Sequence, residues 1–179
     1  MNRRRTILLA ALGTFFASSS AVSPAAASVG PPTYIVNEQS NLTTFLVAPE
    51  CHNFDCLNGK PFHLGSGSDN SYFTTTRNSA NFLQFHWTTS KCIDTRNGSN
   101  EDGTPVVLND CNGSSSQLWF PARSASTGFF LINGAGGGCL DAQNAAFPNP
   151  PAVGAPLQIW GCANSSSPWR GNQIWKVDF

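Results

Sequence analysis

Three short sequence markers recur in the same order along this chain, and their recurrence limits the possible fold more than any other feature. A Gly-x-Pro-x-x-aliphatic segment occurs at residues 59–64, 103–108 and 154–159. The second and third copies follow a Cys-x-Asp marker, at Cys92 and Cys139, and precede a Gln-x-Trp marker, at Gln117 and Gln173. Internal periodicity of about 40–50 residues is typical of repeat architectures.

Each repeat reads as short strands separated by turns. The glycine of the Gly-x-Pro segment supplies a turn, and the residues after it alternate as in a half-buried strand. Gly, Ser, Asn, Thr and aromatic residues are abundant, and no amphipathic helix of useful length follows the first 27 residues. We therefore predict an all-β chain in which three pseudo-symmetric units close around one axis and point the Trp of each Gln-x-Trp into a shared core.

The first copy has lost most of the markers. Aligning Asn37 with Asn133 places Thr43 at the position of the marker cysteine and Phe45 at the position of the acid. Asn70-Ser71-Tyr72 falls about where Gln-x-Trp should stand.

The first 27 residues resemble an export signal. A basic stretch, Arg3-Arg4-Arg5, precedes the apolar segment 7–22 and a small-residue cleavage site at Ala25-Ala26-Ala27. We expect a removed signal peptide at 1–27, by the Sec or the twin-arginine route, and a secreted domain at 28–179. Its repeats are expected at about 32–80, 81–125 and 126–179.

Charge argues against several partner classes. Without its signal peptide the chain keeps seven basic and ten acidic side chains, which gives no basic footprint for nucleic acid. The apolar segment is too short for a membrane span, so no membrane insertion is expected. No catalytic motif or phosphate-binding motif is found, and we expect no enzyme activity and no cofactor.

The six cysteines predict disulfide bonds, because an even number in an exported chain favours pairing. Cys51, His52 and Cys56 offer too few ligands for a zinc site, so no metal is expected. Six cysteines allow fifteen connectivities. The repeat pattern favours Cys51–Cys56, Cys92–Cys111 and Cys139–Cys162.

The combined markers resemble the ricin B-chain type lectins, a family of carbohydrate-binding β-trefoil domains with Gln-x-Trp repeats. The resemblance covers nearly the whole chain after the signal peptide and is strongest from about Phe82 onwards. It implies a disulfide-stapled β-trefoil whose third repeat fills all five family pocket positions. These are Asp141, Gln158, Trp160, Asn172 and Gln173.

The other two repeats depart from this pattern. The second repeat keeps Asp94 and Gln117 but has Asn109 at the aromatic position, which predicts a very weak or inactive second site. The first repeat lacks the acid. We therefore expect one carbohydrate site, in the third repeat.

These five residue types suit a pyranose, which has hydroxyls around its rim and an apolar face. A carboxylate accepts hydroxyl hydrogen bonds, amides donate and accept, and an indole covers the apolar face. A galactose or GalNAc type of sugar leaves one face unusually apolar, which favours stacking. Gln173 is also expected to brace the backbone, and Trp169 is either a loop anchor or a second stacking platform.

Two other functions remain open. The loops at Cys51–Cys56 and Phe147–Pro151 could block a protease, since other trefoils act as inhibitors through exposed loops. Alternatively, the chain could be the glycan-binding subunit of a separately encoded toxin or hydrolase, which would keep the same pocket.

Overall fold

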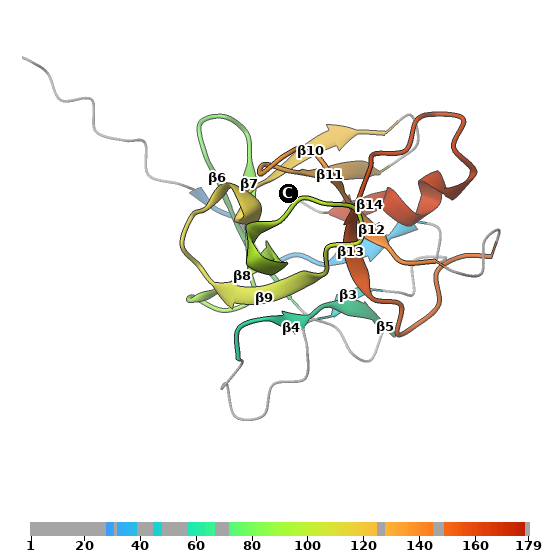
Figure 1. Cartoon of the computed structure of the whole chain (residues 1–179). Helices are drawn as coiled ribbons and strands as arrows, with labels where there is room; N and C mark the ends of the chain where they lie inside the picture. Colours follow the sequence, from blue (N-terminus) through green and yellow to red (C-terminus); the bar gives the residue numbers. More distant parts are fainter. Residues whose placement is uncertain are drawn as a thin grey trace, which may run out of the picture.

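The structure is a computed structural model that describes residues 28–30, 32–38, 45–47, 57–66, 72–124, 128–144 and 149–177. Short β-strands dominate this part of the chain (Figure 1). Its helices are 3-10 turns, and none of them is long and apolar enough to cross a membrane. The strands are β1 (Ser28–Val29), β2 (Ile35–Asn37), β3 (Phe45–Val47), β4 (Lys60–Pro61), β5 (His63–Gly65), β6 (Thr74–Arg77), β7 (Leu83–His86), β8 (Lys91–Thr95), β9 (Val106–Asp110), β10 (Trp119–Arg123), β11 (Phe129–Asn133), β12 (Cys139–Ala142), β13 (Leu157–Trp160) and β14 (Trp175–Val177). The 3-10 helices are η3 (Arg96–Gly98), η4 (Ser115–Gln117) and η5 (Pro168–Gln173).

Six strands form a closed antiparallel ring. Going around it, β2 pairs with β14, β14 with β11, β11 with β10, β10 with β7, and β7 with β6. An antiparallel bridge between Thr33 and Phe73 joins the chain before β2 to the chain before β6 and closes the ring. Closure pairs the strand edges that an open sheet would leave exposed.

Six of the remaining strands form three hairpins, β3–β5, β8–β9 and β12–β13, while β1 pairs with β6 and β4 with β9. The hairpins contact one another in cyclic order through the β4–β9 pair and the bridges His63–Pro156 and Pro105–Gln158. The glycine of each Gly-x-Pro segment has a positive φ, between +81° and +86°, as a turn of this kind requires. Each of these glycines donates its N–H to a strand carbonyl of the next repeat. The three bonds are Gly59 to Leu108 (2.8 Å), Gly103 to Ile159 (2.8 Å) and Gly154 to Leu64 (2.6 Å).

Equivalent positions therefore recur three times. The ring strands place Thr33, Leu83 and Phe129 opposite Phe73, Trp119 and Trp175, respectively. A closed six-stranded ring with three hairpins in threefold arrangement is a β-trefoil. The predicted all-β, three-repeat fold is confirmed, while the exact repeat limits and the single-domain assignment stay predictions.

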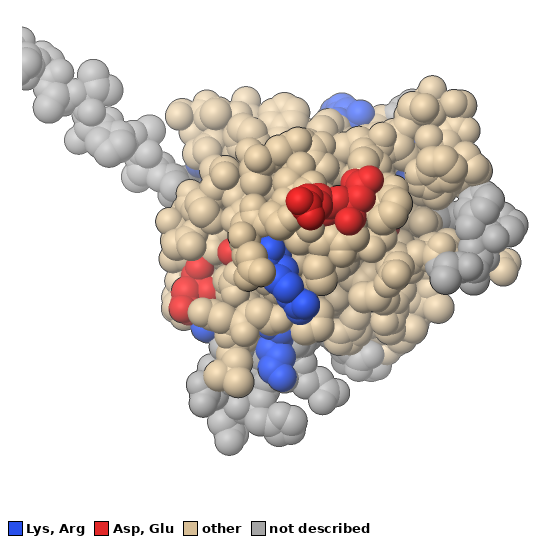
Figure 2. Space-filling model, viewed as in Figure 1, with Lys and Arg blue, Asp and Glu red and all other residues tan. Residues whose placement is uncertain are grey.

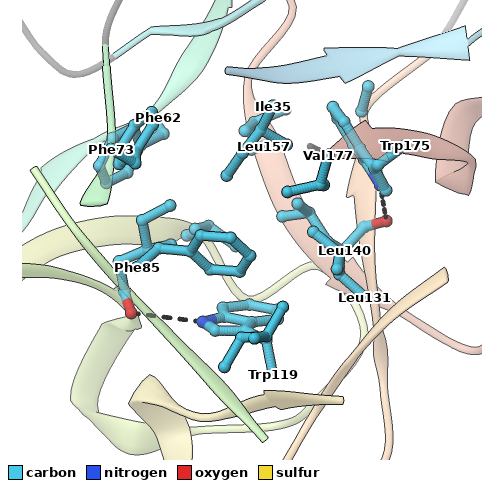
Figure 3. Packing of buried hydrophobic residues seen from close by; sticks show 14 of the residues in the cluster. Ile35, Phe62, Phe73, Phe85, Trp119, Leu131, Leu140, Leu157, Trp175 and Val177 are labelled. Carbon is cyan, nitrogen blue, oxygen red and sulfur yellow. Dashed lines mark hydrogen bonds between the residues drawn. The ribbon is translucent and has the colours of Figure 1, made fainter. Parts of the chain in front are cut away.

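The core lies inside the ring and under the hairpins (Figure 3). Trp119 and Trp175 are buried, as predicted for the Gln-x-Trp tryptophans. Their indole N–H groups donate to the backbone carbonyls of Ile93 (3.4 Å) and Leu140 (2.9 Å) on the hairpins. Each tryptophan thus fills the core and ties its barrel strand to the hairpin of its own repeat.

Two alignments of the first repeat were wrong by small register shifts. Tyr72 is 55% exposed, and Phe73 takes the core position of Trp119 and Trp175. Val47, rather than Phe45, holds the strand position of Asp141, because Val47 pairs with His63 as Asp141 pairs with Gln158. The chain between the aligned asparagine and the hairpin is two residues longer in this repeat, which sequence spacing alone did not reveal. The conclusion that this position lacks an acid is unchanged.

Two of the predicted disulfides are confirmed, Cys92–Cys111 and Cys139–Cys162. Each one links the start of a hairpin to the segment that follows it. The predicted Cys51–Cys56 pair lies outside the described residues, as do Thr43 and the predicted signal peptide.

Candidate functional site

The third hairpin separates its core face from its outer face by strict alternation along β13. Leu157 and Ile159 are buried in the core, whereas Gln158 and Trp160 point outward. Trp160 is 41% exposed, and its ring lies near the turn at Gly103 of the second repeat, where an added Cβ would be 4.0 Å from Cζ3. Two-residue periodicity thus puts an amide and an indole on one face of the strand.

Asp141 lies directly across the hairpin from Gln158. The two residues are Cα partners in the β12–β13 ladder, and Gln158 Nε2 donates to Asp141 Oδ1 at 2.9 Å. Two positions along the ladder Cys139 pairs with Trp160, so the Cys139–Cys162 disulfide anchors the strand end that carries the indole. The hairpin register brings the acid, the amide and the indole together.

Asn172 reaches the same place from η5. The side chain of Asn37, in the first repeat, donates to the backbone carbonyls of Gly171 and Asn172 at 3.2 Å each. Asn144, just after β12, donates from Nδ2 to Asn172 Oδ1 at 3.3 Å. Contacts from the first repeat and from the residue after β12 thus hold Asn172 in position. The sequence alone could assign this residue to the site only through its motif.

These side chains line a cavity of about 480 Å³. Four of the five predicted residues are in its wall, together with three residues that the pattern did not include. The lining consists of Asp141, Gln143, Asn144, Gln158, Trp160, Trp169 and Asn172.

Gln173, the fifth predicted residue, does not line this cavity. Its side chain is fully buried, donates to the Gly161 carbonyl at 3.1 Å and accepts from the Ala163 N–H at 2.7 Å. It also supports Asp141 by a side-chain hydrogen bond. Gln173 therefore braces the site, the second of the two roles expected for it.

Burial raises the pKa of Asp141 to about 6, because a carboxylate loses hydration inside the protein. Hydrogen bonds from Gln158 and Gln173 act in the opposite direction, and the nearby Asp102 carboxylate adds a further upward push. Near neutral pH the group is mostly ionised and accepts hydrogen bonds. A raised carboxyl pKa beside an open cavity is a frequent feature of functional sites.

Charge is otherwise scarce around the site. The face in Figure 2 carries its acidic and basic side chains in small separate groups on a largely uncharged surface. Among the residues that line the cavity, Asp141 is the one carboxyl group, and none is lysine or arginine. Hydroxyl-rich, uncharged molecules fit such a lining better than anions do.

The second repeat brings Asp94, Asn109 and Gln117 together, but these groups bond to one another. Asp94 Oδ2 accepts from Asn109 Nδ2 at 3.0 Å and from Gln117 Nε2 at 3.1 Å, while Oδ1 accepts from the Thr95 N–H at 2.7 Å. Asp94 and Asp141 are equally buried, each 4% exposed, so the two carboxyl groups differ in their bonding and not in their burial. A sugar here would have to displace bonds that the protein already makes, which supports the prediction of a weak or inactive site.

One cluster has the composition of a metal site but not its chemistry. His86 Nδ1 lies 3.4 Å and 3.5 Å from the sulfurs of Cys92 and Cys111. Those sulfurs form a disulfide, whereas metals bind thiolates, and three ligands fall short of a structural zinc site. These residues brace the second repeat.

Comparison with solved structures agrees with the fold. The designed threefold-symmetric protein ThreeFoil matches with a TM-score of 0.63 and 21% identity, over 82% of this chain and 96% of its own. The mdaA-1 domain matches with a TM-score of 0.55 and 17% identity, over 84% and 92%. An exo-β-1,3-galactanase from Clostridium thermocellum matches with a TM-score of 0.56 and 16% identity, over 82% of this chain and 29% of the enzyme. At these identities the likeness shows the fold alone.

No curated protein matches the chain in sequence. The family model described as the ricin-type β-trefoil lectin domain matches residues 83–178, which is more than half of the chain. The match includes the second and third repeats and all the residues of the cavity. This chain therefore belongs to the ricin-type β-trefoil lectin family, whose domains bind carbohydrate and are not catalytic.

Proposed function

We propose that this protein is a secreted, non-catalytic lectin that binds a galactose-type sugar in the cavity of the third repeat. The observation that carries the proposal is the grouping of Asp141, Gln158 and Asn172 beside the exposed indole of Trp160 around one cavity. A carboxylate, two amides and an exposed indole are the groups that a pyranose needs on its rim and on its apolar face.

The hydrogen-bonding state of the site supports binding. Two side chains, Gln158 and Gln173, donate to Asp141, whereas Asp94 has three donors that occupy both of its oxygens. Asp141 also lines the cavity, and an ionised carboxylate has about four acceptor sites, so sugar hydroxyls can still bond to it. Bonds to an ionised acceptor are the stronger kind, which makes Asp141 the principal contributor.

Galactose or GalNAc is the proposed sugar type because its apolar face suits an indole platform. A single shallow site should bind a monosaccharide with a Kd near 1 mM, or about −4 kcal/mol. Stronger attachment would then come from longer glycans or from several sites acting together.

Export is proposed from the leader sequence and from the cysteines. Residues 1–27 have the basic, apolar and small-residue pattern of a signal peptide, and the two disulfides fit an oxidising compartment. Mass spectrometry of the protein recovered from culture medium would test it, with an N-terminus near residue 28 as the expected result.

The binding proposal is tested with residues 28–179 on a glycan array, followed by calorimetry with galactose, GalNAc and glucose. We expect galactose-type binding that Asp141→Ala and Trp160→Ala remove. Phe120→Ala is the matched control, because Phe120 is 38% exposed but belongs to β10 and does not line the cavity. Melting curves must show that all three variants fold, and unchanged binding by folded Asp141→Ala and Trp160→Ala would refute the proposed site.

The inhibitor alternative depends on loops that lie wholly or partly outside the described residues, and no described contact favours it. A protease panel with the same protein separates the two functions. Association with a toxin or hydrolase subunit would leave the sugar site as proposed.

A further inference from the structure

Trp169 is an addition that the third repeat has and the second lacks. Eleven positions separate Cys162 from Gln173, compared with six between Cys111 and Gln117. The extra length lengthens the 3-10 helix from three residues in η4 to six in η5, and Trp169 is its second residue. The inserted indole lines the cavity and is 45% exposed.

The segment that carries Trp169 is held by hydrogen bonds on both sides. Before it, Asn164 Oδ1 accepts from the Ser166 N–H at 3.0 Å and from Ser167 Oγ at 3.0 Å. After it, Arg170 Nη2 donates to Ser124 Oγ at 2.9 Å, and the guanidinium lies 5.6 Å from the centre of the Phe130 ring. A fixed backbone presents the exposed indole at a low entropic cost of binding.

Polar side chains share the cavity wall with Trp169. Asn144 donates to Asn172 Oδ1 at 3.3 Å and to the Asn149 carbonyl at 2.7 Å, and Gln143 beside it is exposed in the cavity wall. The loop between β12 and β13 is also longer than its counterpart between β8 and β9. The described start of this loop, at Gln143 and Asn144, and the longer η5 thus border one cavity.

We propose that this cavity holds at least two linked sugar residues, one at Asp141 and Trp160 and a second stacked on Trp169. This inference rests on the proposed lectin function. A volume of about 480 Å³ lies within the range of about 300–1,000 Å³ that accommodates drug-sized ligands. Two exposed indoles, Trp160 and Trp169, line this cavity and together offer more apolar surface than one pyranose face covers. Gln143 and Asn144 supply hydrogen bonds for the second residue, so the site selects glycan chains over free monosaccharides.

The test compares galactose with lactose and β-1,3-galactobiose, by calorimetry, on wild type, Trp169→Ala, Trp169→Phe and Asp141→Ala. We expect wild type to bind at least one disaccharide about tenfold more tightly than galactose, which is a usual effect of one added apolar contact. Trp169→Ala should remove that preference and leave the galactose Kd within about twofold. Trp169→Phe should keep part of the preference, and Asp141→Ala should abolish binding of all three sugars.

Equal affinity of wild type for galactose and both disaccharides would overturn the second subsite while leaving the lectin function intact. The same conclusion follows if Trp169→Ala weakens galactose and the disaccharides by the same factor, since Trp169 would then belong to the first subsite. If wild type binds none of the three sugars, the proposed galactose specificity fails and the two-residue site for these glycans fails with it.

Discussion

Sugar binding by this protein should depend on pH through Asp141. The pKa of this carboxyl group in the folded protein is about 6, compared with 3.8 in an unperturbed aspartate. The ionised fraction is therefore about 0.1 at pH 5 and about 0.9 at pH 7. If sugar hydroxyls bind the carboxylate form, the apparent Kd is the intrinsic Kd divided by that fraction, and it should rise about tenfold between pH 7 and pH 5.

Calorimetry at half-unit steps from pH 4.5 to 8 measures the apparent Kd, and NMR titration of the Asp141 carboxyl carbon measures its pKa. A bound sugar favours the ionised form, so the titration midpoint should move down when sugar is present. Burial is the main cause of the raised pKa of Asp141, and the Asp102 carboxylate adds to it. Asp102→Asn is the informative variant, because it removes that added charge and keeps an oxygen that can accept from the Gly161 N–H. The midpoint should then shift to lower pH.

Asp110→Asn serves as the control, since that exposed carboxyl group pairs with Lys91 at the second hairpin. This variant should leave unchanged the pH at which Asp141 is half ionised and at which sugar binding weakens. A Kd that stays constant from pH 5 to 7.5 in wild type would refute the reasoning, because either the pKa is ordinary or the neutral acid binds equally well.

Further predictions concern stability. Because the pKa of Asp141 is raised, its ionisation lowers the free energy of unfolding at pH values above the unfolded pKa of 3.8; this penalty reaches at most about 3 kcal/mol above pH 6 and vanishes below about pH 4. Asp141→Asn should therefore unfold at a higher denaturant concentration than wild type at pH 7.5, and the difference should close at pH 4. Trp175→Phe should cost about 3 kcal/mol in urea unfolding, because it opens a void and leaves a hairpin carbonyl without its donor. Replacing Cys139 and Cys162 by serine should lower the free energy of unfolding by about 3 kcal/mol, the value for a loop of this length, and an unchanged melting temperature would contradict the bond's structural role. Gly154→Ala should cost about 1 kcal/mol or more by thermal melting, because alanine is strained at its φ of +86°.

The first repeat shows where reasoning from sequence lost accuracy. Its asparagine was aligned correctly, since Asn37 and Asn133 face Trp175 and Trp119 in the same way. Beyond it, the longer connection shifted the hairpin by two residues, so Phe45 was given a position that belongs to Val47. A shift of that kind cannot be seen in a segment that has lost its motifs, because strand periodicity is the same after two residues.

The site illustrates a different limit. The resemblance to the lectin family, carried by the spaced motifs, assigned Asp141, Gln158 and Trp160 to the site, and the register of the hairpin, set by its turn and its alternation, brings them together. Gln143 and Asn144 were not found, since a polar residue after a strand has no signature of its own. Trp169 was recognised as part of an insertion, but the sequence of the chain did not show which surface of the protein its side chain would face.

The sequence by itself determined the repeat, the turn glycines, two disulfides and the identity of the core tryptophans. These depend on local spacing and alternation, which the chain carries in every copy. Only the tertiary structure decided that Asn37 of the first repeat holds the segment with Asn172, that Asp94 is occupied by its own neighbours, and that Trp169 shares a cavity with Trp160. Those outcomes depend on contacts between distant segments, which form only when the ring closes and which no local pattern encodes.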